Sequence, residues 1–505
     1  MELLVAAMMA LADPATLTRT LDDAGMPRSA TVLLASLAED GQQPEDVRAA
    51  AKRMLAERAA QDPALALLLL SKQSDPGALP PALAVAVARA HLESALQLAP
   101  PEEGVAFGPL EQQPLQPASQ VTNEKPKPAQ AELDRARALA ASVPADSPLS
   151  AEAHGVAGLA AIAAGDEAGA EKEFVAVVDL PVARNDAAGQ RRRDLAYLQL
   201  ARLAYQGGDD ARAVQLYQRV SRGAPEWLDA LFEASWAHFR RGEDEKALGS
   251  LLTLSAPFFQ QRFFPESFVL KALVLYQNCR YADARAAIAA FEQRYRPVHD
   301  GLAETLAHFR SPQDASELLA RGAPGLQDAV PAAAREEMAI LEQSPDLAGA
   351  MAAARQLADE IDSIDKRPEP FRDSALIAVV APRARAARIA LLDAGGRRLI
   401  SRIAEERAEL RELLGQSLRL SYEIAGREKE LLGVPEASLT PKQHRDPPHV
   451  ADDEELWPFQ GEYWRDELGD YEYRLGRRCA KPRPPPQTAQ PEVPASPDKV
   501  AGGAR

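Results

Sequence analysis

Cysteine, aromatic residues and long apolar runs are all scarce in this chain of 505 residues. The two cysteines, Cys279 and Cys479, form neither a disulfide framework nor a metal-ligand spacing, although their pairing with each other stays open. No stretch reaches the ~18–20 consecutive apolar residues that a membrane-spanning helix needs. Aromatic residues make up only 5% of the chain, and the absence of any extended alternating pattern excludes a predominantly β fold.

Sequence motifs of enzyme active sites are also missing. There is no phosphate-binding glycine loop followed by lysine, no His-Glu-x-x-His sequence and no nucleophile elbow. His444 and His449 are close together, but they lie in a proline-rich stretch that favours a solvated loop over a metal site. His238 fits a core-facing helix position, and the Glu405–Glu406 pair fits a solvated helix face. We therefore expect no enzyme activity, cofactor or bound metal.

The charge and the commonest residues point to an acidic, helical protein. The chain carries 74 acidic and 58 basic residues, a formal net charge of −16. Nucleic-acid binding is disfavoured, because it needs a positive field that displaces counterions from phosphates. Alanine, leucine, glutamate and arginine dominate, and these residues favour helices. The composition thus predicts an all-α fold.

A repeat runs through residues 194–298. Gly208, Gly242 and Cys279 head the same kind of predicted turn, with Gly242 34 residues after Gly208 and Cys279 37 residues after Gly242. In the helix before each turn, a small residue lies near the middle and an aromatic residue near the end. In the helix after the turn, a small residue is followed by two large apolar residues. These rows are Ala201, Ser235 and Ala272; Tyr205, Phe239 and Tyr276; Ala213, Ala247 and Ala284; Tyr217, Leu251 and Ile288; and Val220, Leu254 and Phe291. A fixed period of this length indicates stacked helix pairs.

These rows resemble the tetratricopeptide repeat, a helix–turn–helix unit of 34 residues with short side chains where its two helices meet. Pro225 supplies the closing proline of the first unit, whereas Pro257 comes early and Pro297 late. A fourth unit at 151–184 also fits, and residues 181–193 then form a loop or a helix extension. Its matching residues are Gly158, Gly165, Ala170 and Phe174. The resemblance implies a helical-repeat solenoid over residues 129–300.

The same resemblance implies a concave groove, lined by the first helix of each unit, that holds a peptide or a helix of another protein. Carried over position by position, the groove residues are Leu198, Arg202, Tyr205 and Gln206 in one unit, Phe232, Trp236, Phe239 and Arg240 in the next, and Val269, Leu273, Tyr276 and Gln277 in the third. The alternative is that some rings only fill the seam between units. We favour that seam for Phe239 and Tyr276, and the groove for Trp236 and Arg240.

The chain before the repeats divides into three predicted parts. Residues 1–12 form an apolar run ending in Ala-Leu-Ala, which resembles the remnant of a secretory signal peptide or else a first buried helix. Residues 13–99 form a helical region that could hold degenerate repeats. Residues 100–128 contain seven prolines and form an extended linker.

The chain after the repeats also divides into three. Residues 301–434 are a helical extension with a long amphipathic helix at 384–432, which Gly395-Gly396 could interrupt. This helix forms a hairpin with residues 338–364 or self-associates with another chain. Residues 435–480 are an aromatic-rich segment that docks on the helices or presents a partner-binding motif. Residues 481–505 form a disordered, proline-rich tail.

The repeats, the long helix and the closing segment Trp457-Pro-Phe to Gly469 together resemble large repeat proteins of myxobacterial-type cell envelopes, some of them in gliding-motility machinery. The resemblance implies a non-enzymatic scaffold for protein–protein interactions in the periplasm or cell envelope. The alternative is a cytoplasmic co-chaperone or regulatory adaptor, which would have no cleaved leader.

Overall fold

The computed structural model describes residues 13–59, 79–96, 130–259, 262–309, 311–321, 330–432, 460–471 and 473–475. Within these ranges the chain is all-helical, with 18 α-helices and no strand, which confirms the prediction of an all-α protein. Several predicted features lie outside the described residues: the leader at 1–12, the linker at 100–128, the tail at 481–505, His444, His449, Trp457 and Cys479.

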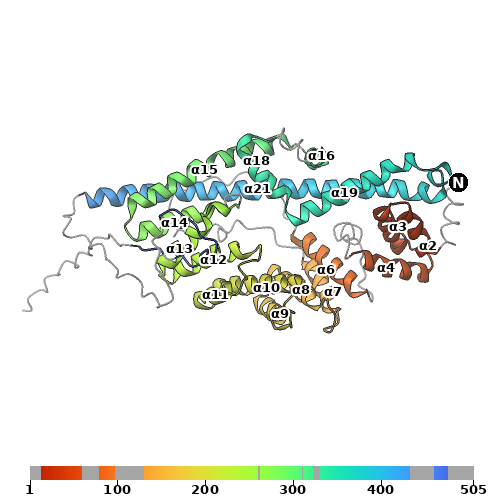
Figure 1. The fold of residues 1–505 in the computed structure, drawn as a ribbon, viewed down its shortest axis with the longest axis horizontal. Helices are drawn as coiled ribbons and strands as arrows, with labels where there is room; N and C mark the ends of the chain where they lie inside the picture. The colour runs from red at the N-terminus through yellow and green to blue at the C-terminus, as the bar shows by residue number, and fades with distance from the viewer. Residues whose placement is uncertain are drawn as a thin grey trace, which may run out of the picture.

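The helices follow one another around an arc that the C-terminal helices close (Figure 1). The arc contains α2 Pro14–Asp23, α3 Pro27–Glu39, α4 Glu45–Ala59, α6 Pro81–Leu96, α7 Gln130–Ala141, α8 Ser150–Ala163, α9 Glu167–Asp179, α10 Ala187–Gln206, α11 Asp210–Tyr217, α12 Trp227–Arg240, α13 Asp244–Leu254, the short 3-10 helix η2 Pro257–Phe259, α14 Pro265–Gln277 and α15 Tyr281–His308. The closing helices are α16 Pro312–Arg321, α18 Arg335–Glu342, α19 Pro345–Ser363, α20 Glu369–Arg372 and α21 Ala375–Leu431.

Aspartate and proline mark the helix starts. The carboxylates of Asp166, Asp186 and Asp209 each accept a hydrogen bond from the backbone N–H three residues later, at 2.8–3.0 Å. Such caps satisfy one of the N–H groups that a helix start leaves without a partner. Pro312 begins α16 and Pro345 begins α19, at the first helical position that tolerates proline.

The turns within successive helix pairs share one backbone geometry. Gly165, Gly208, Gly242 and Cys279 have φ of 76°, 81°, 72° and 57°, so all four adopt the left-handed conformation. After Gly208, the N–H of the next residue reaches back to the Ala204 carbonyl at 2.9 Å, and the other three turns repeat this bond at 2.9 Å. This is the Schellman end of a helix. The predicted turn positions are confirmed, and Gly25 makes the same turn between α2 and α3.

Small residues lie where the paired helices meet. The six predicted small positions are fully buried: Ala201, Ser235, Ala272, Ala213, Ala247 and Ala284. In the fourth unit, a Cβ added at Gly158 would lie 2.8 Å from the Phe174 ring, so the ring packs directly on the glycine backbone. Contacts run from each helix to the next through α15, which gives a helical-repeat-like arrangement. The N-terminal helices share one buried cluster that extends from Leu21 to Ala160.

Two long helices continue through glycine or proline. Helix α21 runs through Gly395 and Gly396 without interruption over 57 residues. Helix α15 runs through Pro297 and on to His308. In α21, packing explains the glycines, because a Cβ on Gly396 would lie 2.5 Å from the Pro312 carbonyl oxygen. The glycine pair therefore allows close helix crossing and does not end the helix.

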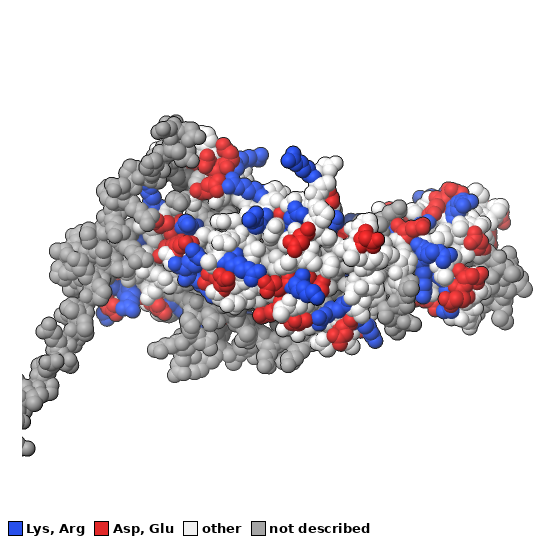
Figure 2. Space-filling model, turned by 90° about the horizontal axis from the view of Figure 1, so that it is seen from below, with Lys and Arg blue, Asp and Glu red and all other residues white. Residues whose placement is uncertain are grey.

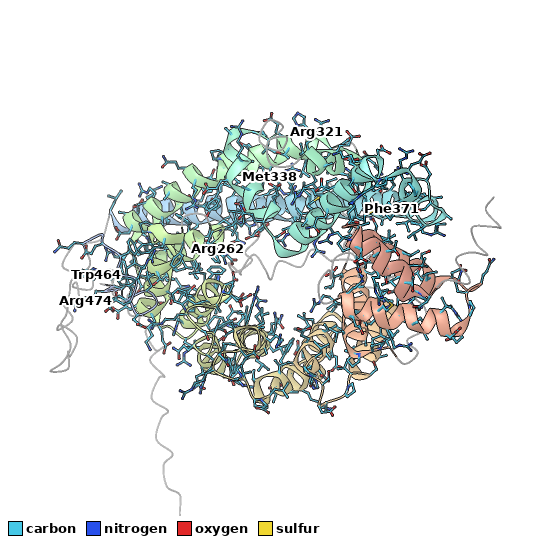
Figure 3. All side chains as sticks on the ribbon, turned by 45° about the vertical axis from the view of Figure 1, so that its right-hand side comes forward. Arg262, Arg321, Met338, Phe371, Trp464 and Arg474 are labelled. Carbon is cyan, nitrogen blue, oxygen red and sulfur yellow. The ribbon has the colours of Figure 1, made fainter. Side chains whose placement is uncertain are left out.

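The long helix α21 connects the two ends of the arc. It packs against α19, and it also contacts α3 near one end of the arc and α14 and α15 near the other. Ile364, Ile377 and Val380 belong to the buried cluster of the N-terminal helices. Viewed from another side, the described helices form a closed circuit (Figure 3). No helix in the described part of the chain is both long and apolar enough to cross a membrane.

A cluster of buried carboxyl groups lies between α18 and α21. Glu337 and Glu406 are 7% and 8% exposed, and each has a carboxylate oxygen without a hydrogen-bond partner. Burial, together with repulsion from neighbouring carboxylates, raises the pKa of Glu337 to about 7 and that of Glu406 to about 9. Arg402 opposes both shifts, whereas the carboxylate of Glu409 adds to them. These groups are therefore protonated more readily in the folded protein than in the unfolded chain.

We expect this cluster to make stability depend on pH. Because the folded state binds more protons, stability falls as pH rises from about 5 to about 9. Glu406→Gln removes the ionising group, so its melting temperature should exceed that of the wild type by a margin that grows with pH. Melting curves of both proteins at pH 5, 7 and 9 measure this margin, with half-exposed Glu405→Gln as the control. A constant margin across the pH range would contradict the prediction.

Candidate partner-binding surface on helices α10, α12 and α14

The twelve predicted groove residues form four rows across α10, α12 and α14. Exposure increases along each helix toward its C-terminal end. The first two rows are buried or half-buried: Leu198, Phe232 and Val269, then Arg202, Trp236 and Leu273. The third row is half-buried and the fourth exposed: Tyr205, Phe239 and Tyr276, then Gln206, Arg240 and Gln277. The accessible part of the surface is therefore the C-terminal turn of each helix.

The prediction that Trp236 faces a partner was wrong. Trp236 is 7% exposed and belongs to a buried cluster with Leu248 and Leu251 of α13. Its ring meets Phe239 edge-on, with 5.9 Å between the ring centroids. Leu198 is 3% exposed and packs in the neighbouring cluster. Both side chains therefore hold helices together and offer almost no surface to a ligand.

Arg202 joins α10 to α12 by a charged hydrogen-bond network. Its Nε and Nη2 atoms donate to both oxygens of Glu233 at 2.6–3.1 Å, and the Tyr217 hydroxyl donates to the same carboxylate at 3.0 Å. Burial raises the pKa of Tyr217, and the Glu233 charge raises it further. Asp229, one turn earlier on α12, has its pKa raised by burial, which Arg262 opposes. The sequence search missed these acidic partners, although their spacing of four residues places both on one face of α12.

Arg240 holds the end of α12 against the preceding unit. Its guanidinium lies 4.3 Å from the centroid of the Tyr205 ring, donates to the Tyr205 carbonyl at 3.2 Å and pairs with Asp210 at 3.2 Å. These are cation–π and charge-assisted contacts, which order a side chain before any ligand arrives. Burial raises the pKa of Tyr205, and Arg240 opposes that shift. Arg240 remains exposed, so it both joins two units and faces solvent.

Helix α21 covers the third unit. Leu273 belongs to the same buried cluster as Leu420 and Ile424 of α21, and Val269 belongs to a cluster with Leu410 and Leu413. Burial raises the pKa of Tyr276, and Glu423 and Arg427 of α21 also act on its hydroxyl. The α14 part of the predicted groove is therefore occupied by the chain itself. The remaining open surface belongs to α10 and α12.

The described residues contain no group of three or more His, Cys, Asp or Glu side chains placed to hold a metal ion. A pocket of about 160 Å³ lies between α16, α19 and α21, with Leu319, Met351 and Leu392 among its lining residues. It is smaller than the roughly 300 Å³ at which sites for small organic molecules begin. His238 is buried and pairs with Glu243 at 2.7 Å, as expected for a packing residue.

The fold defines a class, the all-α proteins with a helical-repeat-like arrangement. No family model matches the chain, and no curated protein shows significant similarity to it.

Proposed function

We propose that this chain is a non-enzymatic scaffold of the tetratricopeptide-repeat type that binds other proteins through the C-terminal turns of α10 and α12. The observation that carries the proposal is the outward row formed by Gln206 and Arg240, at equivalent positions of adjacent units. Tyr205 and Phe239 lie directly before this row and are half-buried.

The chemistry of this surface suits a polypeptide ligand. Arginine and aromatic side chains carry much of the binding energy in protein interfaces. Tyr205 and Asp210 already order the Arg240 side chain, so less of its conformational entropy is lost when a partner binds. On the face in Figure 2, acidic and basic side chains are interspersed, and neither sign gathers into a continuous patch. Such a mixed surface supports protein recognition rather than binding to a phosphate backbone.

The compartment that we propose is the cell envelope, in an assembly of the kind suggested by the resemblance to myxobacterial-type repeat proteins. Cross-linking in the native cell, followed by mass spectrometry, reports compartment and partner together. Recovery of periplasmic or envelope proteins supports the proposal. Recovery of cytoplasmic chaperones alone would favour the adaptor alternative.

A photo-reactive amino acid at Gln206 tests the surface itself. Gln206 is exposed at the end of α10, so the substitution should leave the fold intact. We expect a discrete cross-linked partner from this position and none from the matched control at Gln218, an exposed glutamine at the end of α11. Equal capture from both positions would show that α10 and α12 do not form the binding surface.

A further inference from the structure

The described residues 460–471 and 473–475 contact the connection before α12 and both ends of α13. Trp464 and Arg474 mark this segment at the edge of the molecule in Figure 3. The rings of the segment differ in burial, because Trp464 is 53% exposed, whereas Tyr473 packs against a buried cluster. Tyr463 and Tyr471 contact each other, with ring centroids 6.1 Å apart. Tyr473 and Leu475 pack against a buried cluster that includes residues of α12, α13 and α14, and the short stretch from Leu468 to Asp470 makes further contacts.

Asp470 supplies the charged contact. Both of its carboxylate oxygens accept hydrogen bonds from Nη2 of Arg222, at 2.6 and 2.7 Å. Nη1 of the same arginine donates to the Asp466 carbonyl at 3.3 Å. Arg222 lies in the connection between α11 and α12, beside the first turn of α12. Arg222 thus donates hydrogen bonds both to an acidic side chain and to the backbone of the segment.

Gly469 supplies the steric contact. Its φ is 98°, and a Cβ added there would lie 2.9 Å from Cζ2 of Trp227. Its N–H donates to the hydroxyl of Thr253 at 3.1 Å, and this threonine is fully buried. Leu468, immediately before it, is 6% exposed. The site therefore requires glycine at this position and accepts an apolar residue before it.

Backbone hydrogen bonds continue along the segment to α13. The N–H of Tyr473 donates to the Glu245 carbonyl at 3.2 Å, and the N–H of Leu475 donates to the Glu245 carboxylate at 3.1 Å. At the other end, the Arg465 guanidinium lies 5.0 Å from the centroid of the Phe258 ring. The described residues of the segment form no helix or strand, so its release costs no secondary structure.

We propose that the outer face of α12 and α13 is a peptide-recognition site for a Leu-Gly-Asp sequence in a turn conformation, which the chain fills with its own residues 468–470. A partner protein that carries such a sequence binds there by displacing the internal segment. The residues of the site define the peptide sequence that it binds. Arg222 favours aspartate, the contact with the Trp227 ring requires glycine before it, and the buried position before the glycine favours leucine. Because the internal copy is tethered, it competes at a high effective concentration and keeps the site closed until a partner is abundant. This site uses other residues than the surface formed by Gln206 and Arg240.

A fluorescent peptide with the sequence of residues 460–475 tests the proposal against the full-length protein. The wild type should bind it weakly, because its own segment occupies the site. Gly469→Ala in the protein places a methyl group against Trp227 and releases the internal copy. We expect fluorescence anisotropy to show binding at least about tenfold tighter in this variant. Asp470→Ala in the protein is a second, independent way to release the segment, and we expect it to increase the affinity for the peptide by less.

Specificity is tested in the Gly469→Ala protein. Adding Arg222→Ala, or using a peptide with Asp470→Ala, should weaken binding several-fold, because the Arg–Asp pair is about half exposed. A peptide with Gly469→Ala should not bind measurably. Far-ultraviolet circular dichroism confirms that each variant keeps its helices. The proposal would be overturned by equal peptide affinity for wild type and Gly469→Ala, by no binding to either, or by an affinity that Arg222→Ala does not change. None of these outcomes would affect partner capture from Gln206.

Discussion

Replacing Glu360 with alanine is expected to lower the free energy of unfolding by about 3 kcal/mol, since it removes a buried charged acceptor of several hydrogen bonds. Glu360 lies on α19 and is 7% exposed. Its carboxylate accepts hydrogen bonds from the N–H groups of Arg28 and Ser29 at 2.9 and 2.8 Å, and from the Ser29 hydroxyl at 2.7 Å. These N–H groups belong to the first turn of α3, whose donors have no partners within the helix. The carboxylate thus caps a helix that begins more than 300 residues earlier in the sequence.

Urea-induced unfolding followed by circular dichroism measures this loss. Asp359→Ala is the matched control, because it removes an exposed carboxylate from the adjacent position of α19 and should change stability by less than about 0.5 kcal/mol. Hydrogen exchange should show faster exchange of the α3 amides in Glu360→Ala alone. Equal stability of the two variants would mean that the cap contributes nothing to the closure between α3 and α19.

The second large effect is expected from Gly396→Ala. A Cβ at this position would lie 2.5 Å from the Pro312 carbonyl oxygen and 2.9 Å from the Ser316 backbone nitrogen. Both are backbone atoms of α16, so the methyl group fits only if α16 moves away from α21. We expect a loss of about 2–3 kcal/mol, as for other overpacked helix contacts. The neighbouring Gly395→Ala should cost less, because its nearest atom is the flexible end of Met351.

The matched control for this series is Gly426→Ala in the same helix. No atom lies within 4 Å of a Cβ at Gly426, so the substitution should stabilise the protein by about 0.5–1 kcal/mol through helix propensity alone. Melting temperatures should therefore rank Gly426→Ala above wild type, then Gly395→Ala, then Gly396→Ala. If Gly396→Ala were as stable as Gly426→Ala, α16 and α21 would not approach as closely as the structure shows.

Local features of the fold were predictable from the sequence. The left-handed turns at Gly208, Gly242 and Cys279 follow from a spacing that repeats, and a helix pair must turn at equivalent points of each unit. Burial at Ala201 and Ala213 follows in the same way, because only short side chains allow close helix contact. Each of these features depends on residues within a single unit or between adjacent units.

Features that depend on distant parts of the chain were not predictable. The motif places Trp236 and Leu273 on the groove side, but it cannot report which other helix covers them. Leu273 is covered through α21, whose contact with α14 joins segments about 150 residues apart. The Glu360 cap is equally remote from α3. The sequence alone leaves the effect of Gly395-Gly396 open, because a glycine pair weakens an isolated helix but allows a close neighbour in a packed one.

The contact between α21 and both ends of the arc changes how the protein responds to force and to partial unfolding. In an open repeat array, each unit contacts only its neighbours. The terminal units therefore unfold first, and the superhelix extends easily under force. Here α21 acts as a strut across the arc, fixed to α3 at one end and to α14 at the other. Elongation of the arc must first break one of these attachments. The distance between its first and last units is therefore set by the length of a single helix.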